Sequence, residues 1–201
     1  MTLVLVVTTG IVTGAALRST AVPSVVSVCR GARTASVTTA ATTASVTSIS
    51  PGPTAPVGAL PPALEDTPAR LRLLPVFRQW ASICALPAAL VEATCWWESG
   101  WQQDVVSRTG AVGLCQIEPS AAQTVRQLLD DHSLDPHSAT DNIEMSAAYL
   151  RWLLDETGGS QDLALAGYYQ GPTSVKEHGI LPGSRPYVTG ISALLADYSW
   201  I

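Results

Sequence analysis

The sequence predicts a mainly α-helical domain preceded by a disordered N-terminal extension. From about residue 68 onward, apolar residues recur at helical spacing, and few segments alternate with a period of two. All six tryptophans and all five tyrosines lie beyond residue 79, so the residues suited to a core are in the later part of the chain. The 201 residues suffice for one domain plus an extension. The net charge is −5 and Lys176 is the only lysine, so no basic surface for nucleic acid is expected.

The beginning of the chain divides into two segments by composition. Residues 1–31 contain a hydrophobic run from Leu3 to Leu17, which is too short for a stable membrane span and has the length of a signal-peptide core. The run is atypical because no Lys or Arg precedes it and Arg18 follows it. Residues 32–66 are rich in Ser, Thr, Ala and Pro, and such a segment buries too little apolar surface to offset the entropy lost on ordering. We therefore predict an exported protein whose domain follows a disordered tether.

Residues 67–201 form the predicted domain, and several residues mark where its helices begin and end. Pro75 is expected to break or kink the first helix, and Pro87 suits the first position of the second. Asp141 and Glu144 have capping-box spacing, and Gly158-Gly159 is expected to stop the helix that they open. The predicted helices run from Pro68 to about Cys84, Pro87 to Trp97, Pro119 to about Leu129, Asp141 to Asp155, Leu163 to Tyr169, and about Arg185 to Tyr198.

A single carboxylate at the end of the second helix is the first candidate for chemistry. Glu98 lies in the stretch Trp96-Trp97-Glu98-Ser99-Gly100-Trp101, and it continues an apolar stripe formed by Val91 and Cys95. Burial among apolar groups raises the pKa of a carboxyl group, and a carboxylic acid that is still protonated near neutral pH can act as a general acid. The alternative is a solvated glutamate at a helix end that Gly100 terminates.

The four cysteines leave their oxidation state open. Outside the cytoplasm a disulfide among the three in the domain can form, but the sequence does not choose the pair, and one remains unpaired unless the cysteine of the N-terminal segment reaches it. A buried free thiol is the alternative. The cysteines are Cys29, Cys84, Cys95 and Cys115. Neither they nor the histidines have metal-ligand spacing, so we expect no metal and no cofactor. The histidines are His132, His137 and His178.

The order of these motifs resembles the lysozyme-like lytic transglycosylases that cleave bacterial peptidoglycan. The resemblance covers about residues 70–196 and implies a helical fold similar to goose-type lysozyme and the SLT domain. The matching pieces are Glu98-Ser99-Gly100, Ser107-x-x-Gly110-Ala111-x-Gly113-Leu114-x-Gln116, Asn142 with Tyr149-Leu150, Tyr168 with Gly171, and Tyr187.

The resemblance implies a lyase that acts in cell-wall turnover with Glu98 as the sole general acid and base. Glu98 would protonate the oxygen between N-acetylmuramic acid and N-acetylglucosamine and then take the proton of the muramic C6 hydroxyl. The product would be a 1,6-anhydro sugar, with the substrate N-acetyl group replacing a second carboxylate. The implied partner is the peptidoglycan glycan strand, and the implied protein is a secreted or cell-wall-associated monomer.

The resemblance also implies substrate-binding roles for five residues around Glu98, each with a structural alternative. Ser107 would line the cleft or simply form a turn, and Gln116 would line the cleft or precede a helix. Asn142 would line the cleft or occupy the first turn of its helix. Tyr168 aligns with the tyrosine that contacts the acid or the sugar, and Tyr187 belongs to the cleft or to the core.

The chain departs from the family pattern at two positions. Cys115 stands where the family commonly has Met, and we expect the core to tolerate this exchange because both side chains are apolar and polarizable. Tyr169 stands where an Asn usually follows the tyrosine, which puts the sugar contacts at that position in doubt.

Two other functions remain open. A muramidase would hydrolyse the same bond and would need a second carboxylate, for which Asp104 and Glu118 are the candidates. A wall-binding module would keep the fold without turnover.

Overall fold

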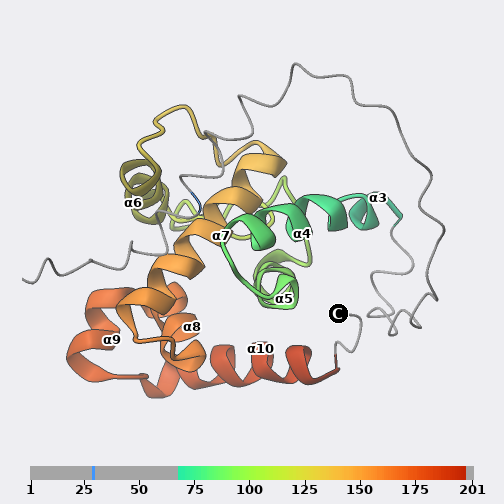
Figure 1. Ribbon diagram of the computed structural model, residues 1–201. Helices are drawn as coiled ribbons and strands as arrows, with labels where there is room; N and C mark the ends of the chain where they lie inside the picture. The colour runs from blue at the N-terminus through green and yellow to red at the C-terminus, as the bar shows by residue number, and fades with distance from the viewer. Residues whose placement is uncertain (1–28, 30–67, 198–201) are drawn as a thin grey trace, which may run out of the picture.

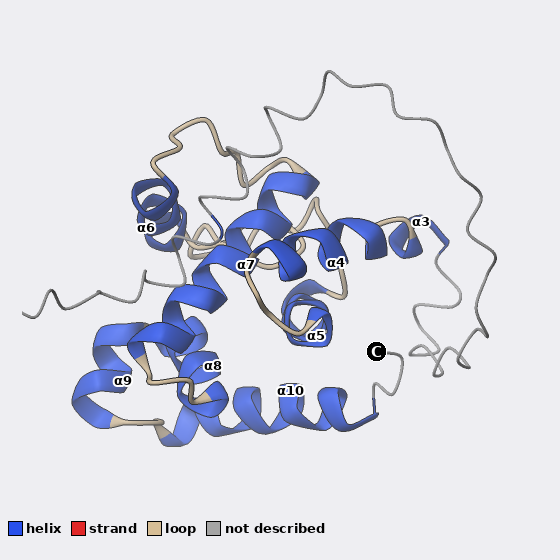
Figure 2. Ribbon diagram, in the orientation of Figure 1, coloured by secondary structure: helices blue, strands red, loops and turns tan. Residues whose placement is uncertain are grey.

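The computed structural model describes Cys29 and residues 68–197 (Figure 1). Apart from Cys29, the predicted signal-like segment and tether lie outside the described residues. The described chain is helical, with two isolated bridges at Val112 in place of strands (Figure 2). The elements are α3 (Pro68–Leu71), α4 (Leu74–Ile83), α5 (Ala88–Ser99), α6 (Pro119–Leu129), α7 (Ala139–Glu156), α8 (Gln161–Gln170), α9 (Pro172–His178), η1 (Pro182–Ser184) and α10 (Arg185–Asp197). None of the described helices has the length and apolar character needed to cross a membrane.

Helix α7 lies at the centre of the fold, with α4, α5, α6 and α8 packed against it (Figure 1). Its apolar residues follow a 3.6-residue period, which gives it a continuous buried face. Leu150 and Leu153 are fully buried on that face. Burial of each such side chain stabilises the fold by about 1.5–3 kcal/mol. Helix α10 packs on α5 and α8, so α5, α7, α8 and α10 meet on one side of the molecule.

The start of α7 differs from its prediction. Ser138, with φ −81° and ψ 127°, is the N-cap, and its Oγ accepts a hydrogen bond of 3.4 Å from the backbone N–H of Asp141. Asp141 and Glu144 therefore lie inside the helix and do not form the predicted capping box. The sequence contains both arrangements, and the serine is the residue whose extended backbone turns the chain into the helix.

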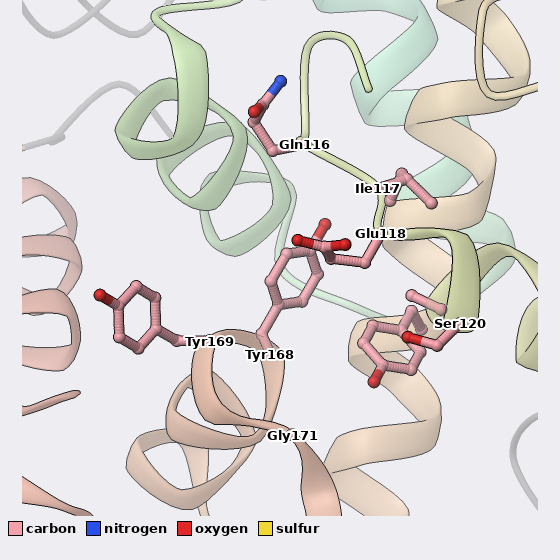
Figure 3. Close-up of a pocket in the computed structure, with 9 residues that line it drawn as sticks. Gln116, Ile117, Glu118, Ser120, Tyr168, Tyr169 and Gly171 are labelled. Atoms are coloured by element: carbon pink, nitrogen blue, oxygen red, sulfur yellow. The ribbon is translucent and has the colours of Figure 1, made fainter. Parts of the chain in front are cut away.

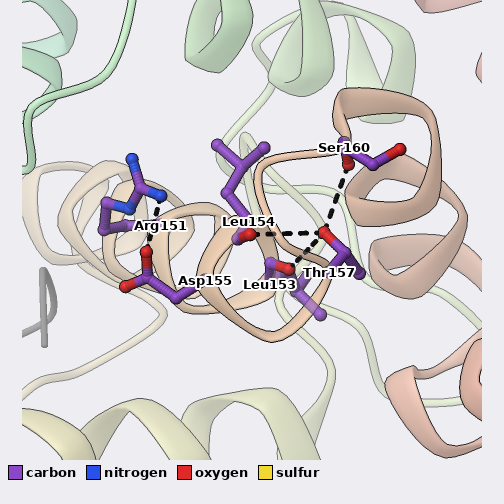
Figure 4. A network of polar contacts seen from close by, with 6 residues as sticks. All are labelled: Arg151, Leu153, Leu154, Asp155, Thr157 and Ser160. Atoms are coloured by element: carbon purple, nitrogen blue, oxygen red, sulfur yellow. Dashed lines mark hydrogen bonds and ion pairs between the residues drawn. The ribbon is translucent and has the colours of Figure 1, made fainter.

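The end of α7 confirms its prediction. Thr157 donates a hydrogen bond of 2.7 Å from its Oγ1 to the carbonyl oxygen of Leu153 and lies 3.2 Å from the carbonyl oxygen of Ser160 (Figure 4). Gly158 and Gly159 follow with φ of 64° and 85°, a left-handed backbone that glycine adopts without steric cost. The two glycines thus stop the helix and turn the chain toward α8.

The first helical stretch divides ahead of the predicted position. The helix stops at Leu71 and restarts at Leu74, so Pro75 lies in the first turn of α4. This turn has no intrahelical partner for the missing proline N–H, so proline is tolerated there and does not kink the helix. Helix α9 lies outside the predicted helices: the Gly171-Pro172 pair predicts the end of the preceding helix, and in the structure Pro172 also begins a new one.

The cysteines form two disulfides, Cys29–Cys84 and Cys95–Cys115, and none of the described cysteines is free. The expectation of a buried free thiol is therefore wrong, and Cys29 supplies the fourth sulfur that the domain lacked. Cys115 also differs chemically from the methionine that the family commonly has at this position, because its sulfur is bonded to Cys95. It forms a covalent link between α5 and the loop that precedes α6.

Candidate active site

Glu98 lies in the last turn of α5, where Gly100 ends the helix with a φ of 64°. The side chain is partly buried, and its Oε1 accepts a hydrogen bond of 2.6 Å from the hydroxyl of Tyr187 on α10. Glu98 is therefore not the solvated surface glutamate that was the alternative prediction. Burial raises the pKa of Glu98 to about 7, while the hydrogen bond from Tyr187 lowers this pKa and the charge of Glu118 raises it. At neutral pH a large fraction of the carboxyl group carries its proton.

The three tryptophans beside Glu98 point in different directions. Trp101 is buried, packs against Phe77 with ring centroids 4.6 Å apart, and donates a hydrogen bond of 3.0 Å to the carbonyl oxygen of Glu92. Trp96 packs edge-on against Trp101, and Trp97 is 45% exposed. The aromatic groups that interact with the Glu98 carboxylate come instead from α8 and α10 and are phenols.

Two tyrosines, Tyr168 and Tyr187, interact with Glu98, and Tyr169 stacks on Tyr187. Tyr187 is 4% exposed, so it belongs to the core as well as to the site. Its ring stacks on that of Tyr169, with centroids 4.8 Å apart. Tyr168 donates its hydrogen bond elsewhere, to the carbonyl oxygen of Cys115 at 2.8 Å. Burial first, and the nearby Glu98 charge second, raise the pKa of both Tyr168 and Tyr187 well above the ordinary tyrosine value, so both hydroxyls stay protonated.

A pocket of about 230 Å³ lies on the same side of the molecule, between the loop before α6 and the end of α8 (Figure 3). Tyr168 and Glu118 belong to its wall and both interact electrostatically with Glu98, which is not itself a lining residue. The exposed ring of Tyr169 forms another part of the wall. The lining residues are Gln116, Ile117, Glu118, Ser120, Ala121, Tyr149, Tyr168, Tyr169 and Gly171.

Ser107 and Gln116 stabilise the loop between α5 and α6. The Oγ of Ser107 accepts hydrogen bonds from the backbone N–H groups of Thr109 and Ala111, which gives Ser107 the turn-forming role that was its alternative. Gln116 has a left-handed backbone with φ of 47°, and its Nε2 donates to the carbonyl oxygens of Val105 and Gly113. Gln116 also lines the pocket, whereas Ser107 does not. A sugar contact from either residue stays a prediction.

Asn142 holds the same loop from the side of α7. Its Oδ1 accepts from the N–H of Cys115 at 2.9 Å, and its Nδ2 donates to the carbonyl oxygens of Val112 and Pro136 at 2.9 and 2.8 Å. The residue is 0% exposed, so no part of it faces the pocket. The structure thus gives Asn142 a supporting position in the first turn of its helix, and its contact with substrate stays a prediction.

Two residues of the site were not singled out in the sequence. Ser99 donates a hydrogen bond of 2.7 Å to the carbonyl oxygen of Leu114, which joins the end of α5 to the loop. Ser146 lies 3.1 Å from the Tyr168 hydroxyl. Ser99 had a signal, because it stands inside the Glu-Ser-Gly motif. Ser146 had none, because a serine on a buried helix face is read as a small core residue.

Of the two candidates for a second carboxylate, Glu118 lies at the site and Asp104 does not line the pocket. Glu118 borders the pocket, and its Oε1 accepts a hydrogen bond of 2.6 Å from Thr109. Asp104 is exposed. Among the described residues, no three side chains of metal-ligand type lie together. The arrangement can supply a proton from Glu98 and phenolic hydrogen bonds beside an open, aromatic-walled pocket.

Comparison with known proteins gives a family and a fold. A family model described as the transglycosylase SLT domain matches residues 75–186. The soluble lytic murein transglycosylase of Escherichia coli (strain K12) is 30% identical over 105 residues, which are 50% of this chain and 16% of that protein. The protein of the same name from Escherichia coli O157:H7 matches with the same identity and coverage.

Two crystal structures share the fold. The 70 kDa soluble lytic transglycosylase of Escherichia coli has a TM-score of 0.57 and 24% identity, covering 61% of this chain and 23% of that one. An inactive mutant of the lytic transglycosylase Slt of Pseudomonas aeruginosa has a TM-score of 0.56 and 23% identity, with the same coverage. The chain thus matches less than a quarter of the length of these relatives.

Proposed function

Because this chain belongs to the family of transglycosylase SLT domains, we propose that it is a peptidoglycan lytic transglycosylase with Glu98 as its general acid and base. The observation that carries the proposal is the carboxyl group of Glu98, which has a pKa of about 7 and lies beside an open pocket. A carboxylic acid with this pKa can both give and take a proton near neutral pH.

The proposed reaction begins when Glu98 donates its proton to the oxygen between N-acetylmuramic acid and N-acetylglucosamine. The bond from this oxygen to the muramic C1 breaks, and the substrate N-acetyl oxygen stabilises the positive charge at C1. The Glu98 carboxylate then takes the proton of the C6 hydroxyl while O6 bonds to C1. The acid is regenerated, no water is consumed, and the product carries a 1,6-anhydro ring.

The tyrosines support both halves of this reaction. Tyr187 donates a hydrogen bond to the Glu98 carboxylate at 2.6 Å, and this bond stabilises the charged form that exists between the two proton transfers. Since the raised pKa of Tyr187 keeps its hydroxyl protonated, it remains a donor throughout. The exposed ring of Tyr169 offers the pocket a flat apolar surface suited to the face of a sugar.

Hydrolysis of the same bond is the second candidate, and Glu118 is the observation that favours it. This carboxylate borders the pocket close enough for its charge to raise the pKa of Glu98, so it could orient a water molecule. The two reactions leave different ends on the glycan. Anhydro ends require ring closure by O6, whereas reducing ends require water.

The deciding experiment is mass analysis of purified peptidoglycan digested by the wild-type protein, by Glu98→Gln and by Glu118→Gln. We expect anhydro-ended products, with a loss of about 10²–10⁴-fold in rate for Glu98→Gln, the usual contribution of a general acid. Glu118→Gln is the matched control and should keep the same products at a comparable rate. Reducing ends that disappear in Glu118→Gln would favour the muramidase, and a wild-type protein that binds sacculi without cutting them would favour the wall-binding module.

The proposed substrate lies outside the cytoplasm, and we propose that the protein is exported and acts as a monomer. The two disulfides support export, since such bonds persist in oxidising compartments. Fractionation of the producing cells, with sedimentation of the purified protein, tests both statements.

A further inference from the structure

The Cys95–Cys115 disulfide links the helix that carries the candidate acid to the loop that forms part of the pocket wall. Cys95 is one helical turn before Glu98 on α5, and both sulfurs are fully buried. Cys115 lies in the loop before α6, directly before the pocket residue Gln116. The bridge therefore joins the helix that carries the acid to the loop that forms part of the pocket.

The backbone of Cys115 is also where α7 and α8 reach this loop. Its N–H donates to Asn142 of α7 at 2.9 Å, and its carbonyl oxygen accepts the hydroxyl of Tyr168 of α8 at 2.8 Å. Ser146 of α7 completes the cluster, lying 3.1 Å from the Tyr168 hydroxyl and 3.5 Å from Cys95 Sγ. A movement of Cys115 would thus shift a pocket wall, a tyrosine and the loop together.

We propose that the Cys95–Cys115 disulfide is a positioning element of the active site, so that glycan cleavage depends on its oxidation. The inference rests on the proposed function, because it concerns the placement of Glu98 against the pocket. The disulfide residues do not touch the substrate. They act through the α5 helix end and through Tyr168.

The loop needs this link because its backbone is unfavourable by itself. Gly113 and Gln116 both have positive φ, and the left-handed conformation at Gln116 is disfavoured for a residue with a Cβ. Besides the bridge, the hydrogen bond from Ser99 to the carbonyl oxygen of Leu114 joins this stretch to the end of α5 in the described part of the chain. Since a misplacement of about 1 Å can lower a rate by about 10²-fold, a small relaxation of the loop is enough to affect turnover.

The dependence on oxidation has a simple chemical form. In a chain whose sulfurs are still accessible, a dithiol reductant supplies two electrons and two protons, the bond between the sulfurs breaks to give two thiols, and the reductant closes into its own disulfide. A chain that folds in a compartment rich in thiols would therefore keep Cys95 and Cys115 reduced. The enzyme would reach full activity only after it folds in an oxidising compartment.

The test compares two variants that each lack one disulfide, Cys95→Ala/Cys115→Ala and Cys29→Ala/Cys84→Ala. The second is a matched control, because Cys84 follows α4 and touches neither the pocket nor Glu98. The two bridges span 20 and 55 residues. Since a longer loop gives more stabilisation, the control should lose more thermal stability.

We expect the loss of activity to follow the opposite order to the loss of stability, and to be larger in Cys95→Ala/Cys115→Ala than in the control. Cys95→Ala/Cys115→Ala should lose about 10–10²-fold in kcat with a smaller change in KM, while the control stays close to wild type. In Cys95→Ala/Cys115→Ala the alkaline limb of the pH–rate profile should also move to lower pH. The reason is that a loosened site admits water, and the added hydration lowers the pKa of Glu98. A disulfide that only stabilises the fold would leave kcat and this limb unchanged below the melting temperature.

A folded Cys95→Ala/Cys115→Ala variant with wild-type kcat would overturn the proposal. If this variant does not fold, Cys95→Ala/Cys115→Met refills the volume of the lost sulfurs, and wild-type activity of that variant would overturn the proposal equally. A wild-type protein that forms no cleavage products refutes the proposed function itself, so the two failures are distinguishable.

Discussion

Tyr187 is the residue that sets the protonation of Glu98 from outside its own helix. Its hydroxyl donates a hydrogen bond to the carboxylate, which stabilises the charged form and lowers the pKa of Glu98. The two residues are 89 positions apart in the chain. Burial acts in the opposite direction and is the larger influence, which leaves the pKa of Glu98 at about 7.

Tyr187→Phe should therefore raise the pKa of Glu98 above its wild-type value. Because the proposed acid works in its protonated form, the alkaline limb of the pH–rate profile should move to higher pH. The rate should fall by about 10–10²-fold, since the charged state loses a hydrogen bond worth about 1.5–3 kcal/mol. The measurement is kcat/KM for peptidoglycan cleavage across the neutral range.

Tyr169→Phe is the control for this effect. It keeps the ring that stacks on Tyr187 and removes a hydroxyl on the exposed side of the pair. Its alkaline limb should coincide with that of the wild-type protein. A limb that does not move in Tyr187→Phe would show that this hydrogen bond does not tune the acid.

At the residue scale, the sequence singled out Glu98 as the candidate acid but did not predict which residues surround it. Glu98 could be chosen because a helical stripe and a Glu-Ser-Gly motif both mark it. Its environment could not be derived, because the indoles adjacent to it in the chain turn toward the core or the surface. The rings that meet the carboxylate come from α8 and α10, and only the family resemblance singled them out.

At the scale of single elements, the loop between α5 and α6 has the tightest requirement. Gly113 has a φ of 77°, and a Cβ built there would lie 2.6 Å from the side-chain amides of Asn142 and Gln103. Both amides bind the loop, since Asn142 bonds Cys115 and Val112 and Gln103 accepts from the N–H of Leu114 at 3.3 Å. An added methyl group would displace them.

Gly113→Ala should therefore destabilise the fold by more than the cost of its backbone alone. Gly158 is a matched control, because its φ is 64° and a Cβ there meets nothing within 4 Å. We expect about 1–2 kcal/mol from the left-handed backbone in Gly158→Ala and a clearly larger loss in Gly113→Ala. Urea unfolding of both variants measures the difference, and equal losses would mean that the amides move aside freely.

Helix boundaries were predictable where a single residue or pair clearly marks the start or end of a helix. Pro119 and the glycine pair after α7 gave correct boundaries, because proline suits a first turn and left-handed glycine ends a helix. The cap of α7 and the existence of α9 were missed. Asp141 and Ser138 are both good caps, and a Gly-Pro pair can end one helix and begin the next, so tertiary packing decides each case.

At the scale of the whole molecule, the buried carboxyl group of Glu92 and the partly buried one of Glu98 make stability depend on pH. Glu92 is 1% exposed, and burial raises its pKa to about 7 despite the nearby charge of Arg78. Glu98 has a pKa raised to about 7 as well. The sequence did carry a signal for Glu92, because the residues three and four positions away on its helix are all apolar. These are Ala88, Ala89, Cys95 and Trp96.

The sign of the dependence follows from proton binding. Between pH 4.5 and about 7 the unfolded chain has lost these protons while the folded protein keeps them, so the unfolded state binds fewer protons. Their contribution to stability is complete below pH 4.5 and is lost as the pH rises toward about 7. The free energy of unfolding should fall across this range for wild type and fall less steeply for Glu92→Gln.

Urea unfolding at intervals from about pH 4 to about pH 8 measures both curves. Glu156→Gln, which changes an exposed carboxylate, is the control and should run parallel to wild type. If the difference between wild type and Glu92→Gln does not change with pH, the buried carboxyl group has an ordinary pKa.

The burial of the four sulfurs determines when the disulfides can form or break. Cys29 is 1% exposed and the other three cysteines are 0% exposed, so small reagents in the surrounding fluid cannot attack the bridges while the domain stays closed. The covalent state reached at the moment of folding is then locked in. The oxidation state of the cysteines in each molecule therefore reflects the compartment in which it folded, whatever medium it enters afterwards.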